Sequence, residues 1–174
     1  MTGVIRRDNS AGSPVAAPRA QRVAVLIPCL DEEVAIAQVV RDFRACLPDA
    51  EIYVYDNMST DRTAEVARQA GAIVPSELRK GKGHVVRRMF GDIDADIYVL
   101  TDGDGTYHAP SAPAMIQELR DGPYDMVTAT RVASDSASYR SGHRLGNRVL
   151  TWAVSTIFQN RLSDMLSGFR VFSR

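Results

Sequence analysis

Hydrophobic and polar positions divide the chain into two kinds of block that follow each other from Val23 onwards. Short apolar blocks rich in Val, Ile and Tyr have the length of buried strands, and longer blocks with apolar residues three and four apart have the pattern of amphipathic helices. The predicted strands are Val23–Ile27, Glu51–Tyr55, Ala72–Val74, Asp96–Thr101 and Asp125–Ala129. The predicted helices are Glu33–Leu47, Thr60–Ala70, Gly83–Gly91 and Ala112–Leu119.

Local signals mark both ends of the second predicted helix. Ser59 or Thr60 is suited to cap its first turn, because a hydroxyl oxygen can accept a hydrogen bond from a free backbone N–H there. Asp61 would lie in the first turn, where the helix dipole favours negative charge. Gly71 follows the last helical residue, where a left-handed conformation commonly ends a helix.

The alternation of short strands with helices is typical of right-handed βαβ units. We therefore expect an α/β fold with a Rossmann-like, mostly parallel central sheet and helices on both faces. Ligands of such sheets bind at the carboxyl ends of the strands. The polar motifs of this sequence follow predicted strands, so the pattern indicates where a site forms without indicating what binds there.

The two ends of the chain differ from this alternating pattern. Residues 1–22 are rich in Ala, Ser, Pro, Gly and Arg without any period, which predicts a disordered tail before a domain at residues 23–174. Later, residues 132–140 are expected to form a loop, Leu145–Phe158 a helix, and residues 168–172 a strand that enters the core. Because the sequence stops at Arg174, directly after this strand, we expect the domain to be C-terminally truncated.

Composition narrows the classes of function. Lys plus Arg equals Asp plus Glu, at 21 each, and this zero net charge gives no reason to expect nucleic acid as a partner. Cys29 and Cys46 match no CxxC or zinc-site spacing, which indicates reduced thiols. No apolar run reaches the roughly 18 residues of a membrane span, and none follows Arg6 and Arg7 as in a secretory leader. We expect a cytoplasmic protein, with association at the inner face of the membrane left open.

Asp102-Gly103-Asp104, after the fourth predicted strand, is the sharpest chemical signal. Two carboxylates separated by a glycine can turn toward one hard cation, and Mg²⁺ and Mn²⁺ take oxygen ligands. The alternative is a solvated acidic turn, because Asp-Gly pairs are common in turns. An EF-hand is excluded, since Pro113 stands at the twelfth position of that loop, where a glutamate is needed.

Three further polar motifs each have a functional and a plain structural interpretation. Residues 28–33, Pro-Cys-Leu-Asp-Glu-Glu, are either a ligand loop or an acidic helix start. Residues 56–63 are either a ligand loop or a turn with a helix cap. Gly81-Lys82-Gly83 is either a flexible turn or a lysine placed near a diphosphate, and it has neither the dinucleotide-binding nor the Walker spacing.

Together these motifs resemble family 2 glycosyltransferases, and within that family the dolichyl- or polyprenyl-phosphate sugar synthases. The resemblance covers about Val23 to Arg174, with its motifs in the family's order. The matching segments are Ile27-Pro28-Cys29-Leu30-Asp31-Glu32, Asp56-Asn57-Met58-Ser59-Thr60-Asp61, Lys80-Gly81-Lys82-Gly83, Thr101-Asp102-Gly103-Asp104-Gly105-Thr106-Tyr107 and Asp164-Met165-Leu166-Ser167-Gly168-Phe169-Arg170.

The resemblance implies a nucleotide-diphospho-sugar transferase (GT-A) fold and a set of residue roles. It places metal and diphosphate at Asp102 and Asp104, with Asp104 also counted among the catalytic residues. The residues it assigns to nucleotide-sugar binding are Pro28, Leu30, Glu32, Asp56, Lys82, Asp102, Gly103 and Arg131. The residues it assigns to the acceptor or to phosphate are Arg131, Ser167 and Arg170, with Arg170 also catalytic. Leu30 stands where lipid-linked mannose synthases often have Tyr, and Thr106 stands where some of them have Gln, so the nucleotide (UDP or GDP) and the sugar stay open.

The implied reaction is inverting transfer of a sugar from a nucleoside diphosphate, helped by a bound Mg²⁺ or Mn²⁺ that stabilises the leaving charge. A sugar hydroxyl as acceptor would need a general base, and Asp164 is the candidate. A phosphate monoester would need none, because its second pKa is about 6. A non-catalytic nucleotide-sugar-binding module is the rival from another class. A sugar nucleotidyltransferase is disfavoured because residues 28–33 lack glycine.

We expect the acceptor to be a polyprenyl phosphate at the membrane surface rather than a saccharide hydroxyl. The segment 167–170 resembles the lipid-phosphate branch of the family. The helix at Leu145–Phe158 combines a basic start with an apolar stripe that includes Trp152, a pattern that also lies at membrane interfaces. Arginine suits phosphate through its bidentate fork, and the basic cluster at this helix comprises Arg140, His143, Arg144 and Arg148. The same stripe can instead pack against the sheet, and the sequence leaves the oligomeric state open.

Overall fold

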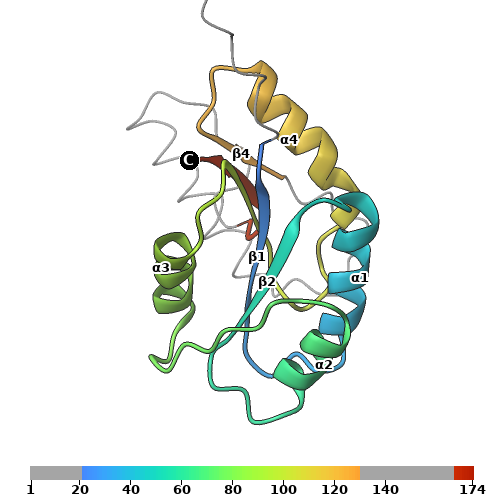
Figure 1. Ribbon diagram of the computed structural model, residues 1–174, viewed down its shortest axis with the longest axis vertical. Helices are drawn as coiled ribbons and strands as arrows, with labels where there is room; N and C mark the ends of the chain where they lie inside the picture. Colours follow the sequence, from blue (N-terminus) through green and yellow to red (C-terminus); the bar gives the residue numbers. More distant parts are fainter. Residues whose placement is uncertain (1–20, 130–166) are drawn as a thin grey trace, which may run out of the picture.

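The computed structural model describes residues 21–129 and 167–174 (Figure 1). In chain order its elements are β1 (Val23–Cys29), α1 (Ile36–Cys46), β2 (Glu51–Asp56), α2 (Thr63–Gln69), α3 (Lys82–Asp92), β3 (Ile97–Leu100), the 3₁₀ turn η1 (Ala109–Ser111), α4 (Ala112–Asp121), β4 (Met126–Thr128) and β5 (Arg170–Ser173). Every predicted strand and helix within these ranges is present except the strand at Ala72–Val74. The predicted tail, the loop at 132–140 and the helix at Leu145–Phe158 lie outside the described residues.

The five strands form one sheet in the order β2-β1-β3-β5-β4. β1 pairs in parallel with β2 and β3, whereas β5 pairs antiparallel with both β3 and β4. The predicted α/β sheet is confirmed, and so is a core strand near residue 174, and the sheet is mixed because β5 runs against its two neighbours. What the sequence pattern did not predict is the place of that strand between β3 and β4, with its direction reversed.

Helices cover both faces of the sheet, as predicted (Figure 1). Alternate residues of β1 face opposite layers. Val25 and Ile27 pack with α1, α2 and α4, and Ala24 and Leu26 pack with α3. This division follows from the side-chain period of two in a strand, and both faces are apolar because both are covered. None of the described helices is long and apolar enough to cross a bilayer.

The start of α2 differs from its prediction. The helix begins at Thr63, and neither Ser59 nor Thr60 caps it. Asp61 lies before the first turn, where its carboxylate accepts a hydrogen bond from the Thr63 backbone N–H at 2.9 Å. The predicted end is confirmed, because Gly71 follows the helix with a φ of +94°. The hydroxyls of Ser59 and Thr60 bind the loop after β1 instead, 28 and 29 residues away in sequence.

The predicted strand at Ala72–Val74 is wrong. This segment forms only isolated parallel bridges beside β2, at Tyr53–Ile73 and Asp56–Ser76. Pro75 interrupts a regular ladder because proline has no N–H to donate. Its carbonyl still accepts a hydrogen bond from the Asp56 N–H at 3.0 Å. The segment therefore borders the sheet without extending it.

Candidate active site

The loops that follow β1 and β2 are bound to each other at the carboxyl edge of the sheet. The Asp31 N–H donates to Ser59 Oγ at 3.0 Å, and the Thr60 N–H donates to Asp31 Oδ1 at 2.6 Å. The Arg62 N–H donates to Glu33 Oε2 at 2.9 Å. Asp31 and Glu33 thus serve the connection between the loops. Glu32 lies between them, and its N–H also donates a hydrogen bond to the second loop. The Glu32 carboxylate makes no hydrogen bond to that loop.

Asn57 fixes a third loop to this edge. Its side chain is 4% exposed, and its Nδ2 donates to the carbonyls of Glu77 and Arg79, each at 2.9 Å. Its Oδ1 accepts from the Gly81 N–H at 2.7 Å, and its own N–H donates to the Cys29 carbonyl at 2.9 Å. Asn57 therefore holds the loop that ends at Lys82. Sequence reasoning assigned Asn57 no role, because the partners of its side chain lie 20 to 24 residues further along the chain.

Lys82 and Asp102 meet where α3 begins and β3 has just ended. The Lys82 ammonium forms an ion pair with Asp102 Oδ1. The predicted lysine near the acidic pair is thus placed directly on one of its carboxylates. Gly168 lies on the other side of Asp102. A Cβ on Gly168 would stand 2.6 Å from Asp102 Oδ2, so the carboxylate can keep its present position only against a glycine.

The middle residue of the acidic motif is also closely packed. A Cβ on Gly103 would overlap the sulfur of Cys29, a residue of β1, so this position also has room only for glycine. Asp104 is exposed, and its Oδ1 accepts hydrogen bonds from the N–H and the hydroxyl of Thr106 at 3.0 and 2.7 Å. The turn thereby holds one oxygen of Asp104 in place and leaves the other free of these bonds.

Negative charge accumulates at this edge. Burial raises the pKa of Glu32, and the nearby Asp104 and Asp102 carboxylates raise it further. Burial also raises the pKa of the Cys29 thiol, with contributions from Glu32, Asp56 and Asp102, so Cys29 is a neutral core thiol. Carboxylates that repel one another offer the oxygen ligands that Mg²⁺ and Mn²⁺ prefer, and a cation between them would relieve the repulsion. The donor set therefore fits a divalent metal at Asp102 and Asp104.

The predicted site residues fall into three groups. Those at the carboxyl edge are Pro28, Leu30, Glu32, Asp56, Lys82, Asp102, Gly103 and Asp104. Ser167 and Arg170 lie beside them through the packing of Gly168 on Asp102, and the Arg170 Nε donates to the Ser167 carbonyl at 3.0 Å. Ser167 is buried, and its Oγ accepts from the Phe169 N–H at 3.3 Å. Arg131 and Asp164 lie outside the described residues.

A cavity of about 110 Å³ opens beside Asp102, between α1 and the segment that follows β3. Gln38, Asp42 and Tyr107 are among the residues that line it, together with Thr101. The Thr101 hydroxyl is buried and has no hydrogen-bond partner among residues 21–129 and 167–174. The Tyr107 hydroxyl accepts from the Gly168 N–H at 2.6 Å, which ties the C-terminal segment to the wall of this cavity.

Known proteins share both the sequence and this architecture. The sequence pattern of Glycosyl transferase family 2 matches residues 24–174. Protein RfbJ of Shigella flexneri is 56% identical over 123 residues, which are 70% of this chain and 95% of RfbJ. A dolichyl-phosphate hexose transferase of Haloferax volcanii is 31% identical over 153 residues, which are 87% of this chain and 66% of that protein.

A solved structure agrees with the fold. Glucosyl-3-phosphoglycerate synthase from Mycobacterium tuberculosis, in complex with Mn²⁺, UDP and glucosyl-3-phosphoglycerate, matches with a TM-score of 0.71 at 26% identity. The match covers 88% of this chain and 57% of the synthase, so the chain spans little more than half of that protein's length. The architecture is the nucleotide-diphospho-sugar transferase (GT-A) fold. The chain belongs to Glycosyl transferase family 2.

Proposed function

We propose that this chain binds a UDP- or GDP-linked sugar at the carboxyl edge of its sheet and transfers the sugar, with inversion, to a polyprenyl phosphate. The observation that carries the proposal is the meeting of Lys82, Asp102 and Gly168 at one point, which brings together a cation, a carboxylate and the C-terminal segment. A diphosphate needs positive charge around it, and the leaving nucleoside diphosphate needs more as the bond to the sugar breaks.

Each part of the edge has a role in this proposal. Asp102 and Asp104 would hold Mg²⁺ or Mn²⁺, which when bound neutralises charge on the diphosphate. Pro28, Leu30, Glu32 and Asp56 would form the wall for the base and ribose. Among the described residues no group of three or more His, Cys, Asp or Glu side chains is arranged for a metal, and the proposal gives the remaining ligand positions to phosphate and water.

Lys82 has two anionic partners in this proposal, the Asp102 carboxylate and the donor diphosphate. Its ammonium pairs with Asp102 here, and its side chain is 55% exposed. A point charge on a flexible four-carbon stem can exchange one such partner for the other without a change in the backbone. The lysine would therefore turn toward the diphosphate when the donor enters.

The choice of acceptor depends on whether the reaction needs a general base. A phosphate monoester is already ionised near neutral pH, so it can attack the anomeric carbon without help. Arg170 and Arg131 would hold that phosphate, with Ser167 beside them, and Asp164 would orient these groups rather than remove a proton. The Haloferax relative, by its name a dolichyl-phosphate hexose transferase, supports a lipid phosphate as acceptor, and the Mn²⁺ and UDP bound by the mycobacterial synthase support the donor and the metal. Such an acceptor would place the protein at the cytoplasmic face of a membrane.

The proposal is tested by transfer of labelled sugar from UDP- and GDP-linked donors. Acceptors are a short-chain polyprenyl phosphate and a panel of free sugars, each with Mn²⁺ or with EDTA. Asp104→Asn should weaken nucleotide binding in Mn²⁺ and leave the fold intact, whereas Asp121→Asn, a matched change on the exposed end of α4, should alter neither. Binding that is unchanged by both Asp104→Asn and EDTA would show the metal assignment to be wrong.

The same assay separates the two alternatives. Transfer to a free sugar with none to the lipid phosphate would assign the protein to saccharide acceptors and make Asp164 the candidate general base. Nucleotide binding without any transfer would favour a non-catalytic binding module, provided that a longer form of the protein gives the same result.

A further inference from the structure

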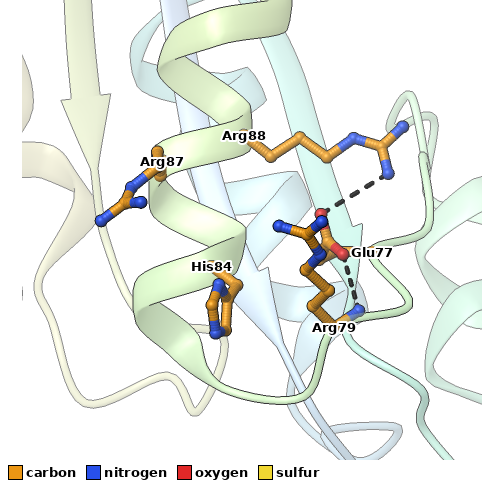
Figure 2. A pocket seen from close by; sticks show the side chains of 5 residues that line it. All are labelled: Glu77, Arg79, His84, Arg87 and Arg88. Atoms are coloured by element: carbon orange, nitrogen blue, oxygen red, sulfur yellow. Dashed lines mark hydrogen bonds and ion pairs between the residues drawn. The ribbon is translucent and has the colours of Figure 1, made fainter.

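A basic surface lies on the outer side of α3, next to the proposed donor site. Its basic members are Arg79, Lys80, His84, Arg87 and Arg88, and the exposed side chain of Leu78 stands at its border; we call these six residues the basic face. Figure 2 shows four of the basic side chains, together with Glu77, around a hollow of about 370 Å³. This is a concentration of positive charge in a chain whose formal net charge is zero.

The positive charge of this face is only partly compensated by neighbouring carboxylates. Within the described part of the chain, the side chains of Arg79, Lys80 and Arg87 make no hydrogen bond or ion pair. The two nearby acidic side chains form their ion pairs with Arg88, which lies 3.5 Å from Glu77 and 3.0 Å from Asp92, and Glu77 also attracts Arg79, whose N–H it accepts at 2.6 Å. Three cationic groups therefore remain available to an external anion.

The arrangement of the side chains indicates an extended partner. Arg87 and Arg88 leave α3 in opposite directions, while Arg79 comes from the facing loop (Figure 2). A single small anion would need donors that converge on one point, and these do not. Leu78 is 77% exposed beside the cations, and exposed apolar and basic groups side by side are the two features that anchor a protein to an anionic lipid surface.

We propose that the basic face docks on an anionic phospholipid membrane, with Arg79, Lys80 and Arg87 among the headgroups and Leu78 at the level of the first carbons of the acyl chains. The loop that carries Leu78, Arg79 and Lys80 is held by Asn57 at the same edge as Lys82, and Arg87 follows in α3, so docking would present the donor site to the membrane. The purpose of docking rests on the proposed lipid-phosphate acceptor, but the binding itself does not.

The expected loss of vesicle binding in each variant follows from the charge and the apolar surface that the variant removes. Each Lys or Arg close to an anionic surface strengthens binding about fivefold. Loss of Arg79, Lys80 and Arg87 together should therefore weaken binding on the order of a hundredfold at low salt, and less at high salt because the charges are screened. Leu78→Ser should weaken it roughly fivefold at any salt concentration, because the contribution of an apolar side chain does not depend on screening.

The test is sedimentation of the 174-residue chain with vesicles of phosphatidylglycerol and phosphatidylcholine, compared with phosphatidylcholine alone. The variants are Arg79→Gln/Lys80→Gln/Arg87→Gln and Leu78→Ser. The matched control is Arg41→Gln/Arg68→Gln/Arg120→Gln, which removes three exposed arginines from α1, α2 and α4 on the other face of the sheet. Lys82 is left intact in all variants, so donor binding measured by calorimetry with UDP and GDP should not change.

The proposal predicts binding to anionic vesicles only, loss in the triple variant and no loss in the control. Equal losses in the triple variant and the control would overturn it, since net charge alone would then account for binding. Displacement of the chain from vesicles by millimolar inorganic phosphate, or tighter binding to single-stranded RNA that the triple variant loses, would also overturn it in favour of a small anion or a nucleic acid. Vesicle binding together with sugar transfer to a free sugar and none to polyprenyl phosphate would leave this inference standing and refute the proposed acceptor.

Discussion

Gly168→Ala tests whether the C-terminal segment shapes the active site. The added methyl carbon would stand 2.6 Å from Asp102 Oδ2 and 3.0 Å from both Asp102 Cγ and Oδ1. One of the two groups has to move. The backbone at Gly168 has little freedom, because the next residue, Phe169, is buried and packs edge-on against Phe43 at a centroid distance of 6.0 Å. Asp102 lies in a loop and is the group that should yield.

The size of the shift sets the size of the effect. Ordinary contact begins near 3.4 Å, so the carboxylate of Asp102 has to retreat by about 0.8 Å from its present position at 2.6 Å. A displacement of about 1 Å in a catalytic constellation costs about a hundredfold in rate. We therefore expect kcat/KM to fall between about tenfold and a hundredfold, with weaker Mn²⁺ binding. The melting temperature should change little, because the strain is relieved at the surface of the sheet edge.

The measurement is steady-state sugar transfer together with Mn²⁺ titration of the UDP complex. Gly91→Ala is the matched control, because Gly91 lies in α3 and a Cβ there would meet no atom within 4 Å. The control should keep full activity and gain up to about 1 kcal/mol of stability, since alanine is the better helix former. If Gly168→Ala keeps kcat/KM within twofold of the parent, Gly168 does not pack against Asp102 in the working enzyme.

Two further predictions concern packing and pH. Gly103→Ala should lower the free energy of unfolding by about 1–3 kcal/mol, because the added Cβ overlaps Cys29. Cys29→Ala in the same chain should restore much of that loss, as measured by urea unfolding, and additive effects of the two changes would contradict the contact. Burial and Asp92 raise the pKa of Tyr55 to about 12, so the folded state keeps a proton that the unfolded state releases near pH 10. Tyr55 should therefore make stability fall as pH rises from 10 toward 12, by about 1.4 kcal/mol per unit, and the total slope should be shallower by about that amount in Tyr55→Phe, where Cys29 and Tyr53 still contribute; equal slopes in the two chains would refute this assignment.

The sequence was sufficient for the elements whose signal is local. The strands β1 and β3 are continuous apolar runs because both faces of the sheet are covered, and such runs are recognisable without any partner. The alternation of strands and helices also predicted that the site lies at the carboxyl edge of the sheet. For Lys82, the motif Gly81-Lys82-Gly83 predicted proximity to a diphosphate but not the ion pair with Asp102.

What the sequence could not supply depends on partners far along the chain. Ser59 has the residue type of a helix cap, but its hydroxyl accepts from the Asp31 N–H, 28 residues away. α2 begins later than predicted for this reason, because the residues before Thr63 are engaged by the loop after β1. The role of Asn57 is of the same kind, since its amide bonds to carbonyls 20 and 22 residues away. No local pattern distinguishes these side chains from ordinary turn residues.

The distribution of exposed apolar side chains connects the donor site with the basic face. Val34 and Met58 are 94% and 51% exposed, and they lie in the loops after β1 and β2, at the same edge as Leu78. A nucleoside diphosphate sugar is polar and charged, so these side chains are not explained by the donor alone. A lipid acceptor brings an apolar chain and a membrane surface to this edge, and both would cover such side chains while the phosphate meets Arg170. The edge that collects the carboxylates thus also collects the groups that a lipid substrate would bury.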